Sequence, residues 1–164
     1  MKPKQLPKEI VELLLPRLSD EFKAFYFYRA AENWCKNVGF EKAAEYFAAE
    51  SADELTHAKL IEKYLVDWNV TPQIPKSEVP QLEFKGLVEL IEEAYKIEYA
   101  LYEEYEDTSG KVFKQGDFCT FDFLQQLRSI QTKSVAEYSD MLNILDGIDR
   151  TNKFYLEELQ KKLF

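Results

Sequence analysis

The sequence contains a single histidine and few of the residues that break helices or form cross-links. Among its 164 residues there are 5 glycines, 6 prolines and 2 cysteines. The scarcity of glycine and proline favours long helices. Cys35 and Cys119 lie far apart with no Cys-x-x-Cys pattern, so we expect two reduced thiols rather than a disulfide framework. Having one histidine excludes zinc-finger patterns and histidine-rich metal sites.

Long apolar runs and a basic charge balance are also missing. No stretch approaches the roughly 18 apolar residues of a membrane helix, and the opening Met-Lys-Pro-Lys-Gln lacks the apolar segment of a signal peptide. We therefore expect a cytoplasmic protein with no membrane partner. The net charge of −9 argues against nucleic acid as a partner, because phosphates require a basic surface. The same charge is compatible with binding cations, or simply with ordinary solubility.

The hydrophobic pattern predicts one all-α domain spanning residues 1–164. Apolar residues recur in steps of three and four, which predicts four long helices over about residues 7–36, 40–69, 84–113 and 117–146. A short amphipathic helix is expected over about residues 150–163, after the break at Gly147. Gly110 is a weak point near the end of the third helix.

The loop between the second and third helices is rich in proline and long enough to cross the bundle. Pro72, Pro75 and Pro80 lie within residues 70–83. Extended, about 14 residues cover roughly 46 Å, whereas a 28-residue helix is about 42 Å long. The second and third helices are therefore predicted to run parallel, as in a four-helix bundle with one long crossover.

Polar residues interrupt the apolar stripe near the middle of each helix. Measured from the two tight turns, these residues all lie about 25 Å along their helices, so they are predicted to share one central layer. They are Glu21 on the first helix, Glu54 and His57 on the second, Glu98 on the third, and Gln131 and Ser134 on the fourth.

Three carboxylates and an imidazole inside a bundle favour a metal site. A buried carboxylate must be neutralised, paired or metal-bound, and no lysine or arginine occupies the inward stripe at this level. Glu54 and His57, three residues apart, lie on one helix face and can share a metal. The two oxygens of Glu54 can bridge two metals. Such a carboxylate-rich site with one imidazole suits iron.

Each of these residues also has a purely structural interpretation. A lone Glu-x-x-His pair often occurs by chance, and Glu21 and Glu98 would be surface residues if the helix phase were shifted by one position. Gln131 with Ser134 fits a neutral hydrogen-bonded pair in the core. It is the coincidence across four helices that favours the metal site.

Two neighbours of the layer remain open to more than one interpretation. Glu50 lies one turn before Glu54, and we interpret it as a supporting or solvated carboxylate rather than a ligand. Tyr28 is equally compatible with a hydrogen bond to the site and with core packing.

Several segments resemble the ferritin family over nearly the whole chain. Residues 20–28 resemble its first-helix signature, and residues 53–58 are similar to its second-helix glutamate–histidine pair. Ile97-Glu98 is similar to the third-helix glutamate, residues 116–124 resemble the start of the fourth helix, and Gln131 falls at the fourth-helix glutamine. The tail resembles the short fifth helix of a shell of roughly 24 subunits.

The resemblance implies an iron-storage subunit with ferroxidase activity. Glu21, Glu54 and His57 would hold a first iron, and Glu54, Glu98 and Gln131 a second, with Tyr28 nearby. Glu50 and Asp53 are weaker metal candidates. The di-iron centre would oxidise Fe(II) with O2 or H2O2, and ferric mineral would collect inside a homo-oligomeric cage.

The sequence departs from parts of the family pattern. Asp53, Ile130, Lys133 and Ser134 stand where bacterial relatives often carry the acids of a third iron site, so a third site is not expected. A second Glu-x-x-His is absent, and no methionine lies in the second helix, so haem is not expected. Asp122 falls where ferritins line the threefold pore, but Gln125 replaces its partner acid. Two alternatives therefore stay open: a storage subunit with a slow, degenerate centre, and a di-iron oxidase that forms no cage.

Overall fold

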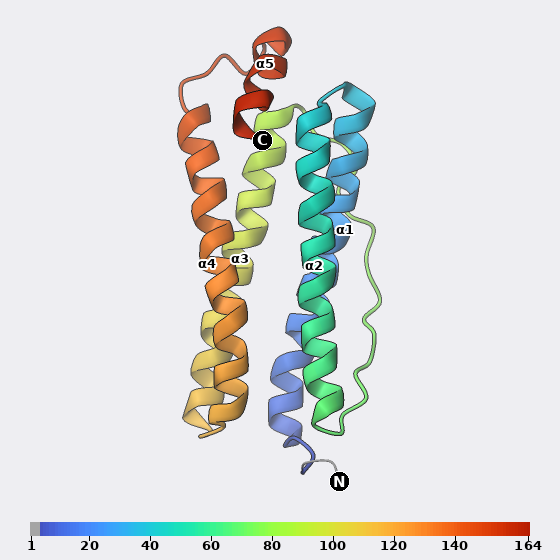
Figure 1. Ribbon diagram of the computed structural model, residues 1–164, viewed down its shortest axis with the longest axis vertical. Coiled ribbons are helices and arrows are strands. Elements are labelled where there is room, and N and C mark those ends of the chain that lie inside the picture. The colour runs from blue at the N-terminus through green and yellow to red at the C-terminus, as the bar shows by residue number, and fades with distance from the viewer. Residues whose placement is uncertain (1–3) are drawn as a thin grey trace.

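The computed structural model describes residues 4–164, and this range contains five helices and no strand (Figure 1). The helices are α1 (Lys8–Val38), α2 (Glu41–Asp67), α3 (Leu87–Lys114), α4 (Phe118–Leu145) and α5 (Lys153–Leu163). Four long helices form a bundle, and the short α5 lies at one end of it. The predicted all-α four-helix bundle with a fifth helix is confirmed.

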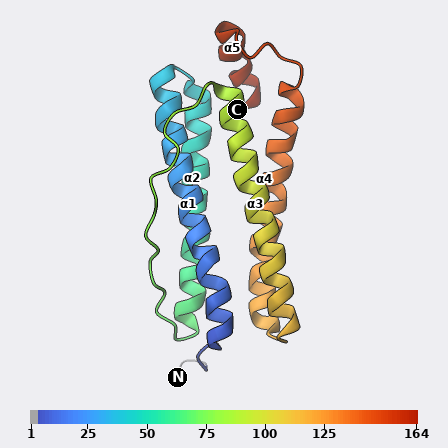
Figure 2. The ribbon, with the colours of Figure 1, turned by 180° about the vertical axis from the view of Figure 1, so that it is seen from behind.

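The segment between α2 and α3 runs along the whole length of the bundle (Figures 1 and 2). It leaves the end of α2 near the N-terminus and reaches the opposite end, where α3 begins. As a result α2 and α3 run in the same direction, while α1 and α4 run the other way. The predicted long crossover and its parallel helix pair are confirmed.

Apolar side chains from all four long helices form one core. Helix α1 packs along α2, α3 packs along α4, and α1 also contacts α3. Ile10, Leu14 and Leu18 of α1 are fully buried, as are Ile61 of α2 and Ile91 of α3. Each such side chain stabilises the fold by roughly 1.5–3 kcal/mol relative to remaining exposed. The centre of this core is where the polar layer interrupts it.

Some helix boundaries differ from the sequence-based prediction for identifiable reasons. Helix α3 starts at Leu87 instead of about 84, because Phe84 is held outside the helix by an edge-on contact with Trp34, 5.4 Å between ring centres. Gly110 does not weaken α3, which continues to Lys114. Helix α5 starts at Lys153 because the Asn152 side chain accepts a hydrogen bond from the backbone N–H of Tyr155 at 3.1 Å.

Helix α5 is attached to the bundle by its polar and aromatic side chains. The Gln160 side-chain oxygen accepts a hydrogen bond from the Ala43 backbone N–H near the start of α2, at 3.2 Å. Phe164 packs on Tyr46 with 4.8 Å between ring centres. In the part of the chain that the structure describes, no helix is long and apolar enough to cross a membrane.

Candidate metal centre

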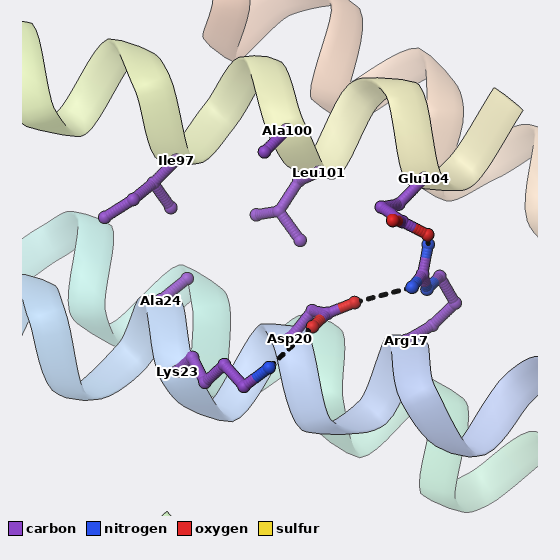
Figure 3. Close-up of a pocket in the computed structure, with 8 residues that line it drawn as sticks. All are labelled: Arg17, Asp20, Lys23, Ala24, Ile97, Ala100, Leu101 and Glu104. Atoms are coloured by element: carbon purple, nitrogen blue, oxygen red, sulfur yellow. Dashed lines mark hydrogen bonds and ion pairs between the residues drawn. The ribbon is translucent and has the colours of Figure 1, made fainter. Parts of the chain in front are cut away.

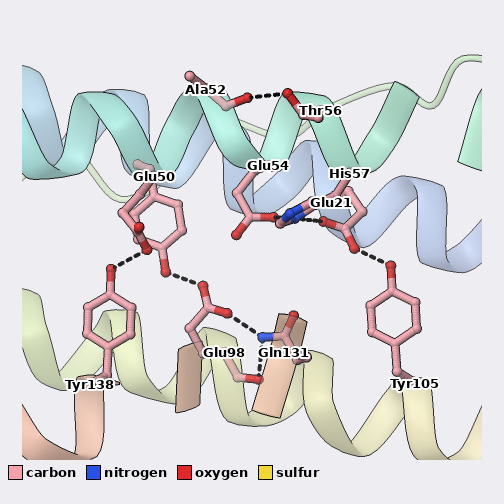
Figure 4. Close-up of polar contacts among 11 residues, drawn as sticks. Glu21, Glu50, Ala52, Glu54, Thr56, His57, Glu98, Tyr105, Gln131 and Tyr138 are labelled. Atoms are coloured by element: carbon pink, nitrogen blue, oxygen red, sulfur yellow. Dashed lines mark hydrogen bonds and ion pairs between the residues drawn. The ribbon is translucent and has the colours of Figure 1, made fainter. Parts of the chain in front are cut away.

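Glu21, Glu54 and His57 meet inside the bundle with their ligand atoms within 4.8 Å of one another. The His57 Nδ1 atom lies 3.1 Å from Glu54 Oε2 and 3.5 Å from Glu21 Oε2. Both glutamates are buried, and the His57 side chain is 13% exposed. Figure 4 shows the three side chains converging from α1 and α2. Two carboxylates and one imidazole are hard and borderline ligands that suit a divalent transition metal.

Glu98 and Gln131 complete the layer from the other helix pair. The Gln131 side-chain N–H donates to the backbone oxygen of Glu98 at 2.9 Å and also to its carboxylate Oε2. The Tyr28 hydroxyl donates to Oε1 of the same carboxylate. Tyr28 is also fully buried and stacks on Phe47, with ring centres 6.0 Å apart. Tyr28 therefore makes both the hydrogen bond and the core contact that the sequence allowed.

Apart from His57, the carboxylates of the layer have no basic counter-charge in the described part of the chain. Within residues 4–164, no lysine or arginine forms an ion pair with Glu21, Glu54 or Glu98. Oε2 of Glu21 is buried and accepts no hydrogen bond of ordinary geometry. A buried oxygen without a donor is costly in a metal-free site and is relieved by a bound cation.

The nearest buried arginine is held by other acids on the α1–α3 side of the bundle. Arg17, only 5% exposed, pairs with Asp20 at 2.8 Å and with Glu104 at 2.5 Å. These groups line one end of a pocket of about 290 Å³, whose other residues include Ala24 and Leu101 (Figure 3). Both terminal nitrogens of Arg17 pair with these acids, and within residues 4–164 Arg17 forms no ion pair with Glu21, Glu54 or Glu98.

Burial and mutual repulsion shift the pKa values of the layer. Burial raises the pKa of Glu54 well above its usual range, and the charges of Glu21 and Glu98 raise it further, against the His57 contact. Burial also raises the pKa of Glu98, although hydrogen bonds from Tyr28 and Gln131 oppose the shift. Burial alone would lower the pKa of His57, but its contacts with Glu21 and Glu54 outweigh burial and raise it to about 10. At neutral pH the metal-free layer therefore holds protons that a metal can replace.

The weaker candidates lie outside this group of ligands. Glu50 is partly buried, and its Oε2 accepts a hydrogen bond from the Tyr138 hydroxyl at 3.0 Å. Asp53 is exposed and Ser134 is partly buried, and within residues 4–164 no hydrogen bond joins either residue to the layer. Burial raises the pKa of Glu50 to about 7, helped by the charge of Glu98.

Two buried tyrosines that donate hydrogen bonds to carboxylates of this region were not recognised from sequence. Tyr105 donates its hydroxyl hydrogen bond to Glu21, and Tyr138 donates to Glu50 (Figure 4). Both lie on the apolar stripes of α3 and α4, where they looked like ordinary core residues. The available signal was the hydroxyl itself, because a fully buried tyrosine needs a hydrogen-bond partner.

The chain is a four-helix bundle with one long crossover and a central layer of carboxylates and one imidazole, the architecture of ferritin-like bundles. A model of the family described as Ferritin-like domain matches residues 11–148, so the chain belongs to the ferritin family. That membership supports a role in iron storage and oxidation in general terms.

Individual relatives agree with this assignment. The chain is 28% identical over 148 residues to a probable bacterial non-heme ferritin-like protein of Haemophilus influenzae, covering 90% of each chain. It is 28% identical over 140 residues to a bacterial non-heme ferritin of Escherichia coli O6:H1, covering 85% of each. Among solved structures, the open pore ferritin of Archaeoglobus fulgidus has a TM-score of 0.90 at 21% identity, over 96% of each chain. A humanized archaeal ferritin gives the same TM-score at 20% identity, over 97% of each chain. At these identities the structural likeness supports the fold alone.

Proposed function

We propose that this chain is a ferroxidase subunit that oxidises Fe(II) at a di-iron centre within the bundle. Glu21, Glu54 and His57 bind the first iron, and Glu54 bridges to a second iron held with Glu98 and Gln131. The observation that carries the proposal is the buried Glu21–Glu54–His57 group, whose ligand atoms lie within 4.8 Å of one another and which pairs with no lysine or arginine among residues 4–164. Tyr28 orients Glu98, and Glu50 and Asp53 stay weaker metal candidates outside this group of ligands.

The reaction follows from two adjacent iron sites. Each Fe(II) gives up one electron, and O2 accepts two electrons and two protons to become H2O2. With H2O2 as the oxidant, the same two electrons and two further protons yield two waters. The layer can supply protons for the reduction of the oxidant. Because the pKa values of Glu54 and His57 are raised, these residues release protons as iron binds.

Storage requires that the ferric product leaves the centre for an enclosed space. We propose a cytoplasmic homo-oligomeric cage of roughly 24 single-domain subunits, without haem. The bundle with an attached α5 supports this assembly, and size-exclusion chromatography tests it. A particle far smaller than roughly 24 subunits would favour the alternative of a di-iron oxidase that forms no cage.

The ferroxidase claim is tested by adding Fe(II) in air and following the absorbance of ferric oxo species. The double variant Glu54→Ala plus His57→Ala should lower the initial rate by more than the about 10- to 100-fold that loss of outer partners costs at metal sites. Glu45→Ala plus Thr56→Ala is the matched control, because both residues are exposed on the same helix. Equal rates for the native chain and the Glu54/His57 variant would refute the proposal.

One observation favours a second candidate, a storage subunit whose centre works slowly. Both carboxylate oxygens of Glu98 already accept hydrogen bonds, from Tyr28 and from Gln131, so these donors compete with a second iron for the lone pairs of this carboxylate. A fast phase that consumes two Fe(II) per subunit supports the full ferroxidase. A fast phase of one Fe(II) or none supports the slow centre.

A further inference from the structure

The two oxygens of the Glu21 carboxylate have different surroundings. Oε1 accepts a hydrogen bond from the hydroxyl of Tyr105, which is 1% exposed. Oε2 faces His57 at 3.5 Å and accepts no hydrogen bond of ordinary geometry. Figure 4 shows Tyr105 approaching Glu21 from the side opposite to His57 and Glu54. One oxygen is therefore occupied by the protein, and the other is directed into the candidate centre.

We propose that Tyr105 is a positioning residue that makes Glu21 a one-oxygen metal ligand. The inference rests on the proposed function, in which Glu21, Glu54 and His57 bind the first metal. A carboxylate binds a metal through one oxygen or through both. The Tyr105 hydroxyl fixes the rotation of the carboxylate and keeps Oε1 engaged, so that only Oε2 is presented. Such partners of metal ligands typically affect metal affinity by about 10- to 100-fold.

The other carboxylates of the region show that this arrangement is particular to Glu21. Glu98 receives donors on both oxygens, from Tyr28 and Gln131. Glu54 Oε2 lies 3.1 Å from His57 Nδ1, and no tyrosine or amide of residues 4–164 donates to the Glu54 carboxylate. Glu21 is the member with one oxygen held and one left buried without a donor.

Tyr138 provides a matched control for the Tyr105 hydroxyl. It is fully buried in the same bundle and donates to a carboxylate, Glu50, at 3.0 Å. Glu50 lies outside the Glu21–Glu54–His57 group. The Tyr138 ring stacks on Tyr28 with 6.4 Å between ring centres, a contact that phenylalanine preserves. Tyr105→Phe and Tyr138→Phe thus each remove one buried hydroxyl. Only the Tyr105 hydroxyl donates to a proposed metal ligand, Glu21.

The test uses Co(II) as a redox-inert probe on the full-length, metal-stripped protein. Tyr105→Phe should weaken binding of the first Co(II) by about tenfold and change the intensity of its visible absorption bands, because the freed carboxylate alters the coordination number. Tyr138→Phe should keep the native affinity and spectrum. Thermal melting of both metal-free variants shows whether they lose similar stability, so that the spectral change is not a consequence of loosened packing.

The possible results distinguish the positioning role of Tyr105 from the proposed metal site. A native Co(II) spectrum and affinity in Tyr105→Phe would overturn the positioning role while leaving the metal site intact. Equal losses in both variants would also overturn it, because the effect would then reflect general loosening. A native chain that binds no Co(II) would refute the proposed metal site itself, and the positioning role with it.

Discussion

Replacing Glu50 by glutamine should stabilise the metal-free protein at alkaline pH and leave it unchanged at acidic pH. Glu50 lies one turn before Glu54 on α2, partly buried, with the Tyr138 hydroxyl on its Oε2. Burial is the main reason that its pKa rises to about 7, and the charges of Glu98, Glu137 and Asp53 add to the shift. Glutamine keeps an oxygen for Tyr138 and removes the charge.

The sign and size of the effect follow from the two pKa values. Below an unfolded-state value of about 4.5 both states bind the proton, and Glu50 costs nothing. As the pH rises from there to about 7, the unfolded chain loses the proton first, so the free energy of unfolding of the native chain falls. Above that window the cost is complete, at about 3 kcal/mol. Glu50→Gln removes it, which corresponds to a melting temperature higher by about 6–12 °C at pH 8.

Thermal melting with a chelator present, at one fixed protein concentration, measures this shift at pH 4 and pH 8. The control is Glu45→Gln on the same helix, whose side chain is 68% exposed, and it should change the melting temperature little at either pH. An equal shift for Glu50→Gln at both pH values would show that the gain has nothing to do with ionisation. No shift at pH 8 would show that Glu50 ionises without cost, contrary to its burial.

Two further predictions concern the layer and the pocket beside it. Because His57 has a pKa of about 10 and must lose its proton to bind a metal, the affinity for the first Co(II) should rise by about tenfold per pH unit between roughly pH 6 and 8. A series of Co(II) titrations at different pH values measures this, and a flat profile would contradict the raised pKa of His57. Arg17→Met keeps the apolar stem but breaks the pairs with Asp20 and Glu104. It should lower the free energy of unfolding, measured in urea, by about 1–3 kcal/mol. The cost is below that of a fully buried pair because Glu104 is half exposed. Lys111→Met, at an exposed pair with Asp107, should cost less than about 0.5 kcal/mol, and equal costs for the two variants would show that burial adds nothing to the Arg17 pairs.

The elements that the sequence predicted well are those set by periodicity and chain length. The steps of three and four placed the four long helices, and the reach of a 14-residue loop was enough to allow a crossover. The level of Glu21, Glu54, Glu98 and Gln131 could be estimated because the helical rise is constant. The errors occur where a tertiary contact overrides the local pattern, as when Phe84 packs on Trp34 instead of starting α3.

Contacts between side chains on different helices could not be predicted in the same way. Periodicity places Tyr105 and Tyr138 on the inward stripes, but not the direction of their hydroxyls, which depends on the rotation of each helix within about one residue. The same limit applies to Gln131, whose amide turns its N–H towards Glu98. Arg17 belongs to α1 like Glu21, and only the structure shows that Asp20 and Glu104 hold it.

The tyrosines and the arginine together explain why the layer is suited to a cation. Tyr28 and Tyr105 stabilise the carboxylates as neutral donors, so they fix geometry without supplying positive charge. Arg17, which could supply it, is engaged elsewhere. Within residues 4–164, His57 is the one basic side chain that pairs with these carboxylates, and its charge is lost when it binds a metal. A divalent ion therefore replaces both the proton and the missing counter-charge. Replacing Tyr28 or Tyr105 by lysine would supply a positive charge beside these carboxylates, and we then expect metal binding to be lost even though all five proposed ligands remain.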